Sequence, residues 1–282
     1  MNLLALDIGG TAVKYGLFGK DTIFGEFLVK DRDKTERLPE KIMEFILEHP
    51  TECIGISAPG PFDFETGTGL MEHKLKSLYK VSLKDMIKQQ FPHVKIFFIH
   101  DSTAFILGAI CDDSTFSTEN IAGVMLGTGL GYVHFSEGKV EVNKNKTPLK
   151  PLWNKPYKGE VAEKYVSATA IINKAQAKGY FFNNVREIAV AARQGNQQLL
   201  HIFAETGSQL GELMVIKKKE DNFDRIIIGG QVSKAWDLMK EGFDANCYVP
   251  YTVVENPEIC PLLGIKYCSE RNVESVYREG ES

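Results

Sequence analysis

Two short segments of the chain combine the residue types that bind phosphate. The first is Asp-Ile-Gly-Gly-Thr at residues 7–11, and the second is Gly-Thr-Gly at residues 127–129. Glycines let backbone N–H groups approach an anion, because no Cβ stands in the way, and threonine adds a hydroxyl donor. Asp7 supplies a carboxylate of the kind that holds hydrated Mg²⁺. One such segment is usually only a turn after a strand, but two in one chain favour a ligand held between two similar lobes.

The residues on either side of each segment predict a β-hairpin rather than a helix. Residues 3–8 are apolar apart from Asp7 and lead into the first glycine pair, and residues 12–18 are mostly apolar again. The same pattern recurs at residues 123–135, where an apolar run reaches the second segment and a second run returns. A Rossmann fingerprint and a Walker loop both need a helix directly after the glycines, so the pattern excludes them.

Three further segments place polar or small residues at the ends of predicted buried strands. Residues 53–57 form one strand, followed by the proline and glycine turn that begins at Ala58. By default such a turn has only a structural role as a rigid connection. Ligands of open α/β sheets bind at strand ends, however, so a ligand-binding role is favoured about equally. A second strand, 94–99, ends just before His100 and Asp101, and a third, 225–228, ends at Gly229 and Gly230.

Asp101 has two interpretations from position alone. It stands at the start of an apolar helix, where an acidic residue commonly acts as an N-cap worth ~1 kcal/mol. It also stands at the mouth expected for a cleft, where a carboxylate can act as a general base. Position alone favours the cap. A glycine pair such as Gly229-Gly230 can admit a flat ring such as adenine, although alone it is only a tight turn.

The remaining pattern predicts an α/β protein. We expect a third hairpin strand at residues 22–30, and later strands at 119–126 and 251–254. Residues 143–156 are basic and interrupted by prolines, which predicts a long loop. Apolar periodicity and capping signals predict helices at residues 38–50, 82–90, 101–110, 159–178, 185–193, 197–218 and 257–271.

Length and composition fit a soluble two-lobed enzyme. The chain has 282 residues, 43% hydrophobic and 25% charged, which is ordinary globular usage. A net charge of −4 gives no indication of nucleic acid or an anionic membrane as partner. No apolar run reaches ~18 residues, so we expect a cytoplasmic protein. The five cysteines never show C-x-x-C spacing, and we expect no disulfide framework and no structural zinc.

The order of these motifs resembles the ROK family, which comprises repressors, open reading frames and sugar kinases within the actin, Hsp70 and sugar kinase superfamily. The resemblance runs from residue 3 to about residue 268. It implies an α/β, two-lobed, actin-like (ribonuclease H-like) ATPase fold with a ligand cleft between the lobes. The motifs that carry it are Asp-Ile-Gly-Gly-Thr at 7–11, Ala-Pro-Gly-Pro-Phe-Asp-Phe-Glu-Thr-Gly at 58–67, His-Asp-Ser-Thr-Ala at 100–104, Leu-Gly-Thr-Gly-Leu-Gly at 126–131, Val-Ser-Ala-Thr-Ala-Ile at 166–171 and Ile-Ile-Ile-Gly-Gly-Gln-Val-Ser at 226–233.

The resemblance also implies a role for each matching residue. Asp101 would be the base that takes the proton from the attacking hydroxyl, which replaces the cap-only interpretation. Asp7 would lie near Mg²⁺, through water. The ATP-binding set would be Asp7, Gly9, Gly10, Thr11, Lys14, Gly127, Thr128, Gly129, Gly229 and Gly230, and the sugar would be bordered by Ser57, Pro59, Gly60, His100 and Asp101.

The family also implies an organisation for the whole chain. The N-terminal lobe would span residues 1–115 and hold the first phosphate loop and Asp101. The C-terminal lobe would span residues 116–282, with its last helix packing back on the N-terminal lobe. Relatives often pair, so we expect a homodimer.

The sequence departs from the family pattern in the region of sugar recognition. The family usually has Asn where this chain has His100, and a small glycine where it has Tyr132, which we expect to narrow the cleft. It also usually carries a Gly-Glu-x-Gly-His segment and a cysteine-rich zinc site, whereas this chain has the lysine and proline loop 143–156. Lysines 144, 146, 150 and 155 would favour an acidic or modified sugar, with His73 approaching from the first lobe, although exposed lysines usually only face water.

The function expected from the family is therefore ATP-dependent phosphorylation of a sugar or sugar-derivative hydroxyl. A catalytically weak or silent sugar-sensing protein is the alternative that the missing recognition segment favours. A transcriptional repressor of this family carries a helix-turn-helix before the first phosphate loop. Only two residues precede the predicted first strand here, so we favour that hypothesis least.

Overall fold

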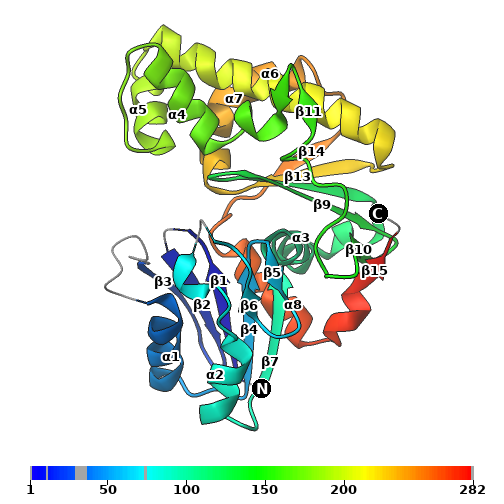
Figure 1. Cartoon of the computed structure of the whole chain (residues 1–282). Coiled ribbons are helices and arrows are strands. Elements are labelled where there is room, and N and C mark those ends of the chain that lie inside the picture. Colours follow the sequence, from blue (N-terminus) through cyan, green and yellow to red (C-terminus); the bar gives the residue numbers. More distant parts are fainter. Residues whose placement is uncertain (1, 11, 29–36, 73–74, 281–282) are drawn as a thin grey trace. The chain divides into compact units, whose positions relative to one another are not determined.

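The computed structural model describes residues 2–10, 12–28, 37–72 and 75–280. It divides into two compact units, drawn in Figure 1. Unit 1 comprises Met1–Thr115, Lys139–Pro148 and Glu258–Ser282, and unit 2 comprises Phe116–Gly138 and Leu149–Pro257. The units thus differ from a single division after residue 115, because two later segments belong to unit 1.

Unit 1 is built on a five-stranded sheet in the order β3-β2-β1-β4-β7. The chain turns back at the first glycine pair, so that β1 pairs antiparallel with β2 as the sequence predicts. Strands β4 and β7 then add parallel to β1. The strands are β1 (Leu3–Ile8), β2 (Ala12–Phe18), β3 (Thr22–Leu28), β4 (Cys53–Ala58) and β7 (Lys95–His100).

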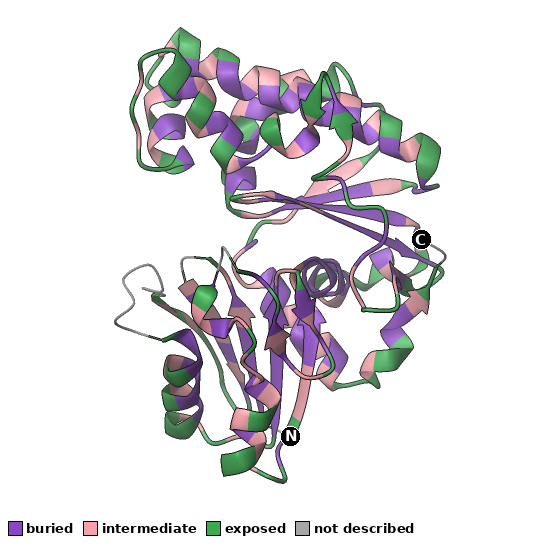
Figure 2. Cartoon of the chain, in the orientation of Figure 1, coloured by how far each residue is buried: buried purple, intermediate pink, exposed green. Residues whose placement is uncertain are grey.

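Helices cover both faces of this sheet. Helices α1 (Leu38–Glu48) and α2 (Leu83–Gln90) pack over one face, and α2 begins at Ser82, whose Oγ accepts a hydrogen bond from the N–H of Asp85 at 3.1 Å. Helices α3 (Asp101–Asp112) and α8 (Cys260–Ser269) pack together over the other face. Helix α3 is buried along its length from Ser102 to Ile110, as Figure 2 shows. This burial fixes the start of α3, and with it the position of Asp101.

Unit 2 places strands β14, β13, β8 and β9 side by side in that order. Their apolar side chains, such as Val124 and Ile228, form one core with the helices of the unit. The elements are β8 (Ile121–Leu126), β9 (Leu130–Ser136), β13 (Arg225–Gly229), β14 (Tyr251–Val253), α4 (Ala168–Ala177), α5 (Val185–Arg193), α6 (Gln197–Glu220) and α7 (Trp236–Asp244).

Short elements complete both units. The brief strands are β5 (Phe62–Asp63), β6 (Thr68–Gly69), β10 (Lys139–Val142), β11 (Pro156–Tyr157), β12 (Glu160–Val161) and β15 (Tyr277–Glu279), and the 3-10 turns are Lys76–Leu78, Ser114–Thr118, Ala162–Lys164, Gln231–Ala235 and Val273–Val276. In the part of the chain that the structure describes, no helix combines the length and apolarity needed to cross a membrane.

The helix predicted at residues 159–178 is wrong over its first half. Lys158 and Gly159 both have positive φ, 47° and 89°, and turn the chain between β11 and β12. Helix α4 starts only after Ser167, whose Oγ accepts a hydrogen bond from the N–H of Ala170 at 3.0 Å. The capping residue, rather than the apolar pattern before it, sets where this helix begins.

Candidate active site

Asp7 and Ser57 lie opposite each other on the parallel strands β1 and β4. Ser57 is fully buried, and its Oγ donates a hydrogen bond to Oδ1 of Asp7 at 2.6 Å. Burial raises the pKa of Asp7 above its usual range, although the charge of Lys14 and the hydrogen bond from Ser57 both lower it. A carboxylate held in this way favours a nearby cation, because a positive charge offsets the cost of its burial.

The start of α3 fixes the Asp101 carboxylate through its Oδ1 atom. Oδ1 accepts from the Ser102 N–H at 2.6 Å and from the Ser102 Oγ at 3.2 Å. Nδ1 of His100 lies 2.9 Å from the same oxygen. Burial raises the pKa of Asp101, but the charge and hydrogen bond of His100 and the bonds from Ser102 outweigh it, so the pKa is lowered. Asp101 is therefore held as a carboxylate, the form that a general base requires.

Position 101 is not the N-cap of the helix. The N-cap is His100, in extended conformation, and Asp101 is the first helical residue. Its carboxylate still interacts favourably with the helix N-terminus. The interpretation of Asp101 as an N-cap is wrong in this detail.

The segment after β4 places small and aromatic residues beside His100. A Cβ added to Gly60 would lie 3.5 Å from Nε2 of His100, and the ring centroids of Phe64 and His100 are 5.7 Å apart. Asp63 fixes the following turn, because its Oδ1 accepts from the N–H groups of Glu65 and Thr66 at 2.9 and 3.3 Å. Unit 1 thus brings Gly60, His100 and Asp101 together, next in the sheet to Ser57, as the sequence predicts for strand ends.

The first glycine turn, at residues 9 and 10, is narrow and open on one side. The N–H of Gly9 donates to the carbonyl of Ala12 at 3.0 Å, and a Cβ at Gly9 would lie 2.9 Å from that oxygen. Gly10 is exposed, and among the described residues nothing lies within 4 Å of the place that its Cβ would take. Lys14 pairs with Asp7 across β1 and β2. Thr11 lies outside the described residues.

The second glycine turn, at residues 127–129, belongs to unit 2 and is held by hydrogen bonds from the start of α4. The N–H of Gly127 donates to the carbonyl of Gly129 at 3.1 Å. The carbonyl of Gly127 accepts from the N–H of Ala168 at 2.8 Å, and the carbonyl of Thr128 accepts from Oγ1 of Thr169 at 3.0 Å. The turn is therefore anchored at the start of α4 through its carbonyl groups.

Glu163 is a residue of this turn that sequence reasoning missed. Its Oε2 accepts from the N–H of Leu130 at 2.9 Å, and a Cβ at Gly129 would lie only 2.3 Å from it. No signal in the sequence points to it, because the pattern of residues 159–178 predicts one continuous helix. Glu163 lies instead in a 3-10 turn that brings its carboxylate back to the glycines.

The glycine pair after β13 lies next to this turn in unit 2. Gly229 pairs with Met125 in the sheet, and a Cβ at Gly230 would lie 2.4 Å from the carbonyl of Leu126. Gly230 has φ 85°, so both its conformation and its contact exclude a side chain. Gly127, Thr128, Gly129, Gly229 and Gly230 thus gather at one edge of the unit 2 sheet.

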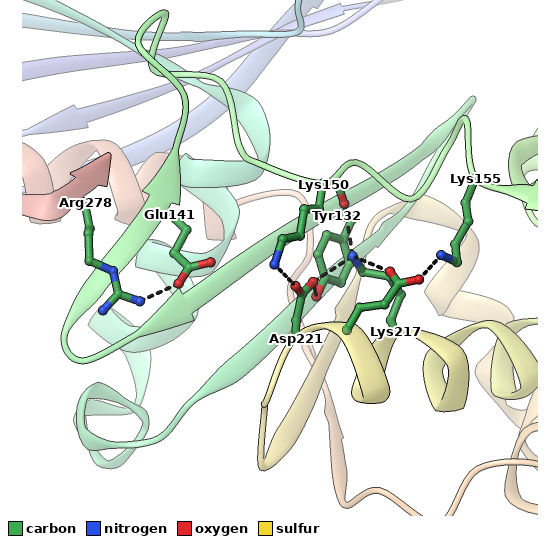
Figure 3. Close-up of polar contacts among 8 residues, drawn as sticks. Tyr132, Glu141, Lys150, Lys155, Lys217, Asp221 and Arg278 are labelled. Atoms are coloured by element: carbon green, nitrogen blue, oxygen red, sulfur yellow. Dashed lines mark hydrogen bonds and ion pairs between the residues drawn. The ribbon is translucent and has the colours of Figure 1, made fainter. Parts of the chain in front are cut away.

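Most lysines of the loop 143–156 are ion-paired, which corrects the expectation that they attract an anionic ligand. Lys150 Nζ lies 2.8 Å from Oδ1 of Asp221, and Lys155 pairs with Glu220 (Figure 3). Lys146, in unit 1, pairs with Glu274. These carboxylates offset the charge on which the preference for an acidic sugar rested. Among the described residues, Lys144 takes no part in these ion pairs. His73 lies outside the described residues.

Tyr132 does not narrow a cleft. Its side chain is buried in the core of unit 2, and its hydroxyl donates to Oδ2 of Asp221 at 2.8 Å (Figure 3). Lys217 Nζ lies 2.7 Å from the same carboxylate oxygen and 4.4 Å from the centroid of the Tyr132 ring. Tyr132, Lys217 and Asp221 therefore form a buried ionic cluster, with the exposed Lys150 at its edge, and this cluster joins the loop to β9 and to the end of α6.

In the described ranges, no group of three or more His, Cys, Asp or Glu side chains is arranged to hold a metal ion. Mg²⁺ commonly uses one or two protein carboxylates together with substrate phosphates. Asp7, half-buried and close enough to Asp101 for their charges to interact, fits that mode of binding.

Comparison with known proteins agrees with the motifs. Curated relatives include an N-acetyl-D-glucosamine kinase of Vibrio atlanticus, 29% identical over 154 residues, which are 49% of this chain and 48% of that protein. A beta-glucoside kinase of Klebsiella pneumoniae is 26% identical over 141 residues, 49% of this chain and 47% of that protein. The chain thus aligns with about half the length of the curated relatives it matches.

Solved structures extend the likeness to nearly the whole fold. A ROK family glucokinase from Streptomyces griseus, in complex with glucose and AMPPNP, has a TM-score of 0.76 at 18% identity, covering 94% of this chain and 98% of that one. A ROK hexokinase from Thermus thermophilus has a TM-score of 0.74 at 18% identity, covering 98% and 100%. The predicted actin-like α/β fold is confirmed. Residues 3–247 match the sequence profile of the ROK family, and the chain belongs to that family.

Proposed function

We propose that this protein transfers the terminal phosphoryl group of ATP to a hydroxyl of a sugar or sugar derivative. The observation that carries the proposal is the Asp101 carboxylate at the end of β7. Its Oδ1 is fixed by the Ser102 N–H, the Ser102 hydroxyl and His100. Among the described residues, none donates a hydrogen bond to Oδ2, which is the oxygen available to accept a proton.

Each residue has a task in this reaction. Asp101 accepts the proton of the attacking hydroxyl, which makes the oxygen a better nucleophile as the new O–P bond forms. Gly9, Gly10 and, in unit 2, Gly127 to Gly129 offer backbone groups to the phosphates. Asp7, with Ser57 behind it, would hold Mg²⁺, and Lys14 adds positive charge on the same pair of strands. Bound Mg²⁺ would neutralise the charge that develops on the transferred phosphoryl group.

The adenosine and sugar sites follow from the remaining residues. The space beside Gly229 and Gly230 would accept the adenine ring. Ser57, Pro59, Gly60 and His100 would border the sugar. The relatives named above act on N-acetyl-D-glucosamine and on beta-glucosides, and we propose a substrate of this neutral, substituted kind. The ion pairs of Lys146, Lys150 and Lys155 remove the argument for an acidic sugar.

A sugar-binding protein with little or no turnover is the second candidate. The observation in its favour is that residues 143–156 form an ion-paired loop where the family usually carries its sugar-recognition segment. Such a protein would bind the sugar without releasing ADP. We also propose that the protein acts in the cytoplasm as a homodimer, as the family often does.

A carbohydrate panel tests the proposal. Purified protein with Mg-ATP is mixed with glucose, mannose, N-acetylglucosamine, N-acetylmannosamine, a beta-glucoside and an acidic sugar, and ADP release is recorded. We expect ADP release with an N-acylated sugar or the beta-glucoside, well above that with glucose or mannose. Sugar binding by calorimetry, with no ADP release from any member of the panel, would instead favour the sensing protein.

A further inference from the structure

The contact between His100 and Asp101 gives His100 a task other than touching substrate. Nδ1 of His100 lies 2.9 Å from Oδ1 of Asp101, and both side chains are largely buried, with 14% and 27% of their surfaces exposed. A bare Nδ1 would bring a ring lone pair against a carboxylate oxygen at hydrogen-bond distance, which is repulsive. A proton on Nδ1 turns the same contact into a charge-assisted hydrogen bond.

The backbone N–H of Ser102 decides between these two states. This N–H is shared between two acceptors: it donates a longer hydrogen bond to Nδ1 of His100, at 3.2 Å, and a shorter one to Oδ1 of Asp101, at 2.6 Å. Oδ1 is therefore the main acceptor of this donor, and Nδ1 does not need to remain an acceptor for it. The geometry favours a proton on Nδ1, and the hydrogen bond made at one ring nitrogen sets the state of the other.

The surroundings of the ring keep it in this orientation. Phe64 lies against it, with the ring centroids 5.7 Å apart, and Gly60 leaves room at the opposite edge, 3.5 Å from Nε2 to the position of an added Cβ. Nδ1 consequently faces the carboxylate and Nε2 faces the Gly60 segment. The two nitrogens of one ring serve different neighbours.

We infer that His100 is a positioning residue that holds the Asp101 carboxylate through an Nδ1–H···Oδ1 hydrogen bond, so that Oδ2 points to the acceptor hydroxyl. The inference rests on the proposed function for the role of Oδ2, but the hydrogen bond itself does not depend on it. In the neutral ring Nε2 is then a bare acceptor, suited to a sugar hydroxyl that donates. A histidine at this position thus orients the base with one atom and selects a donor group with the other.

Nitrogen NMR of the histidine ring tests the hydrogen bond without any assay of activity. The ¹⁵N shifts of His100 are recorded above about pH 8, where an unperturbed histidine is neutral, with the exposed His93→Gln variant to help assign the ring signals. We expect a proton on Nδ1 in the wild-type protein, and its loss from Nδ1 in Asp101→Ala. A bare Nδ1 with the proton on Nε2 in the wild-type protein would overturn the inference.

Two substitutions of His100 separate the roles of Nδ1 and Nε2 in the enzyme kinetics. An asparagine amide can take the place of Nδ1, whereas a glutamine amide takes the place of Nε2. We expect His100→Asn to keep kcat and raise the KM for sugar, and His100→Gln to lower kcat about 10-fold with the sugar KM kept, since a charged hydrogen bond is lost. The reverse pattern, or equal losses of kcat, would contradict the positioning role.

The two experiments also distinguish the inference from the proposed function. A protein that releases no ADP with any sugar would refute the proposed function, while the ring shifts of His100 still decide whether it holds Asp101. An active enzyme with a bare Nδ1 would refute the inference alone. His93→Gln is expected to leave both kcat and KM unchanged.

Discussion

Ser57 donates a hydrogen bond from its Oγ to Oδ1 of Asp7, at 2.6 Å, across the parallel strands β1 and β4. The donor is fully buried, and among the described residues no other side chain donates a hydrogen bond to that oxygen. The pair shows how the sheet keeps a carboxylate beside the first glycine turn, where burial alone would favour its neutral form.

Asp7→Asn should make the protein more stable at neutral pH. Burial raises the pKa of Asp7, so its charged form opposes folding, and stability falls as pH rises through the folded pKa. The gain from the substitution should therefore shrink as the pH falls and Asp7 becomes protonated. Urea unfolding at several pH values measures this, with the exposed Asp21→Asn as a control that is expected to show no such trend.

The same variant should bind Mg-ATP more weakly, because it lacks the carboxylate proposed to face the cation. Calorimetry with Mg-ATP and with ATP in EDTA separates the cation from the nucleotide. An Asp7→Asn protein that is no more stable than the wild type, and that binds Mg-ATP equally well, would contradict both the burial argument and the metal role.

Gly10→Val and Gly129→Val should behave differently. Nothing among the described residues lies within 4 Å of a Cβ at Gly10, so that variant should keep its melting temperature and lose Mg-ATP affinity by ~10-fold or more, since one approach of backbone to phosphate is blocked. A Cβ at Gly129 would lie 2.3 Å from Oε2 of Glu163, so that variant should lose both stability and affinity.

Gly138→Val serves as a matched glycine substitution away from the turns. It lies in a surface turn with open space around its Cβ position but a φ of 77°, so it should lose some stability and no nucleotide affinity. Unchanged affinity in both Gly10→Val and Gly129→Val would mean that the two glycine turns are structural only.

The buried ionic cluster should matter strongly for stability. Lys217 and Asp221 are both 1% exposed in their side chains, so Lys217→Met should cost ~3–5 kcal/mol, since it leaves a buried carboxylate with one partner fewer. Lys240→Met breaks the exposed pair with Asp244 and should cost only ~0–1 kcal/mol. Urea unfolding of the two variants makes the comparison, and equal small costs would contradict the structural role of the cluster.

The cluster also predicts a pH dependence. Burial opposes ionisation of Asp221, but hydrogen bonds from Lys150, Lys217 and Tyr132 outweigh it and lower its pKa. Its contribution to stability is therefore present at neutral pH and is lost as pH falls through the folded pKa. Asp221→Asn should be less stable at pH 7 and lose less stability on acidification.

A zinc chelator should leave the melting temperature of the wild type unchanged, and bound stoichiometric zinc would contradict that prediction.

The parts of the fold that could be predicted are those with local signals. The glycine turn at residues 9 and 10 follows from two apolar runs close in sequence, and Ser82 caps α2 at the expected spacing. The start of α4 was missed, because positive φ at Lys158 and Gly159 and the cap at Ser167 outweigh the apolar pattern.

Contacts between distant residues had no such signal. Tyr132 and Asp221 are 89 positions apart, and Lys150 and Asp221 are 71 apart. A lysine in a basic loop looks the same in sequence whether it faces water or a buried carboxylate. The residues at strand ends, such as Ser57 and Asp101, could be predicted, because parallel strands bring their carboxyl ends to one edge.

Sugar-dependent ADP release by Asp101→Asn, compared with the wild type under saturating Mg-ATP, tests the central claim most directly. The substitution keeps the size of the side chain and its place at the start of α3, so folding and ATP binding should be kept. We predict that turnover with the best sugar of the panel falls by ~10²-fold or more, as expected for the loss of a positioned general base. Turnover close to that of the wild type would contradict the account and leave Asp101 with a structural role at the start of the helix.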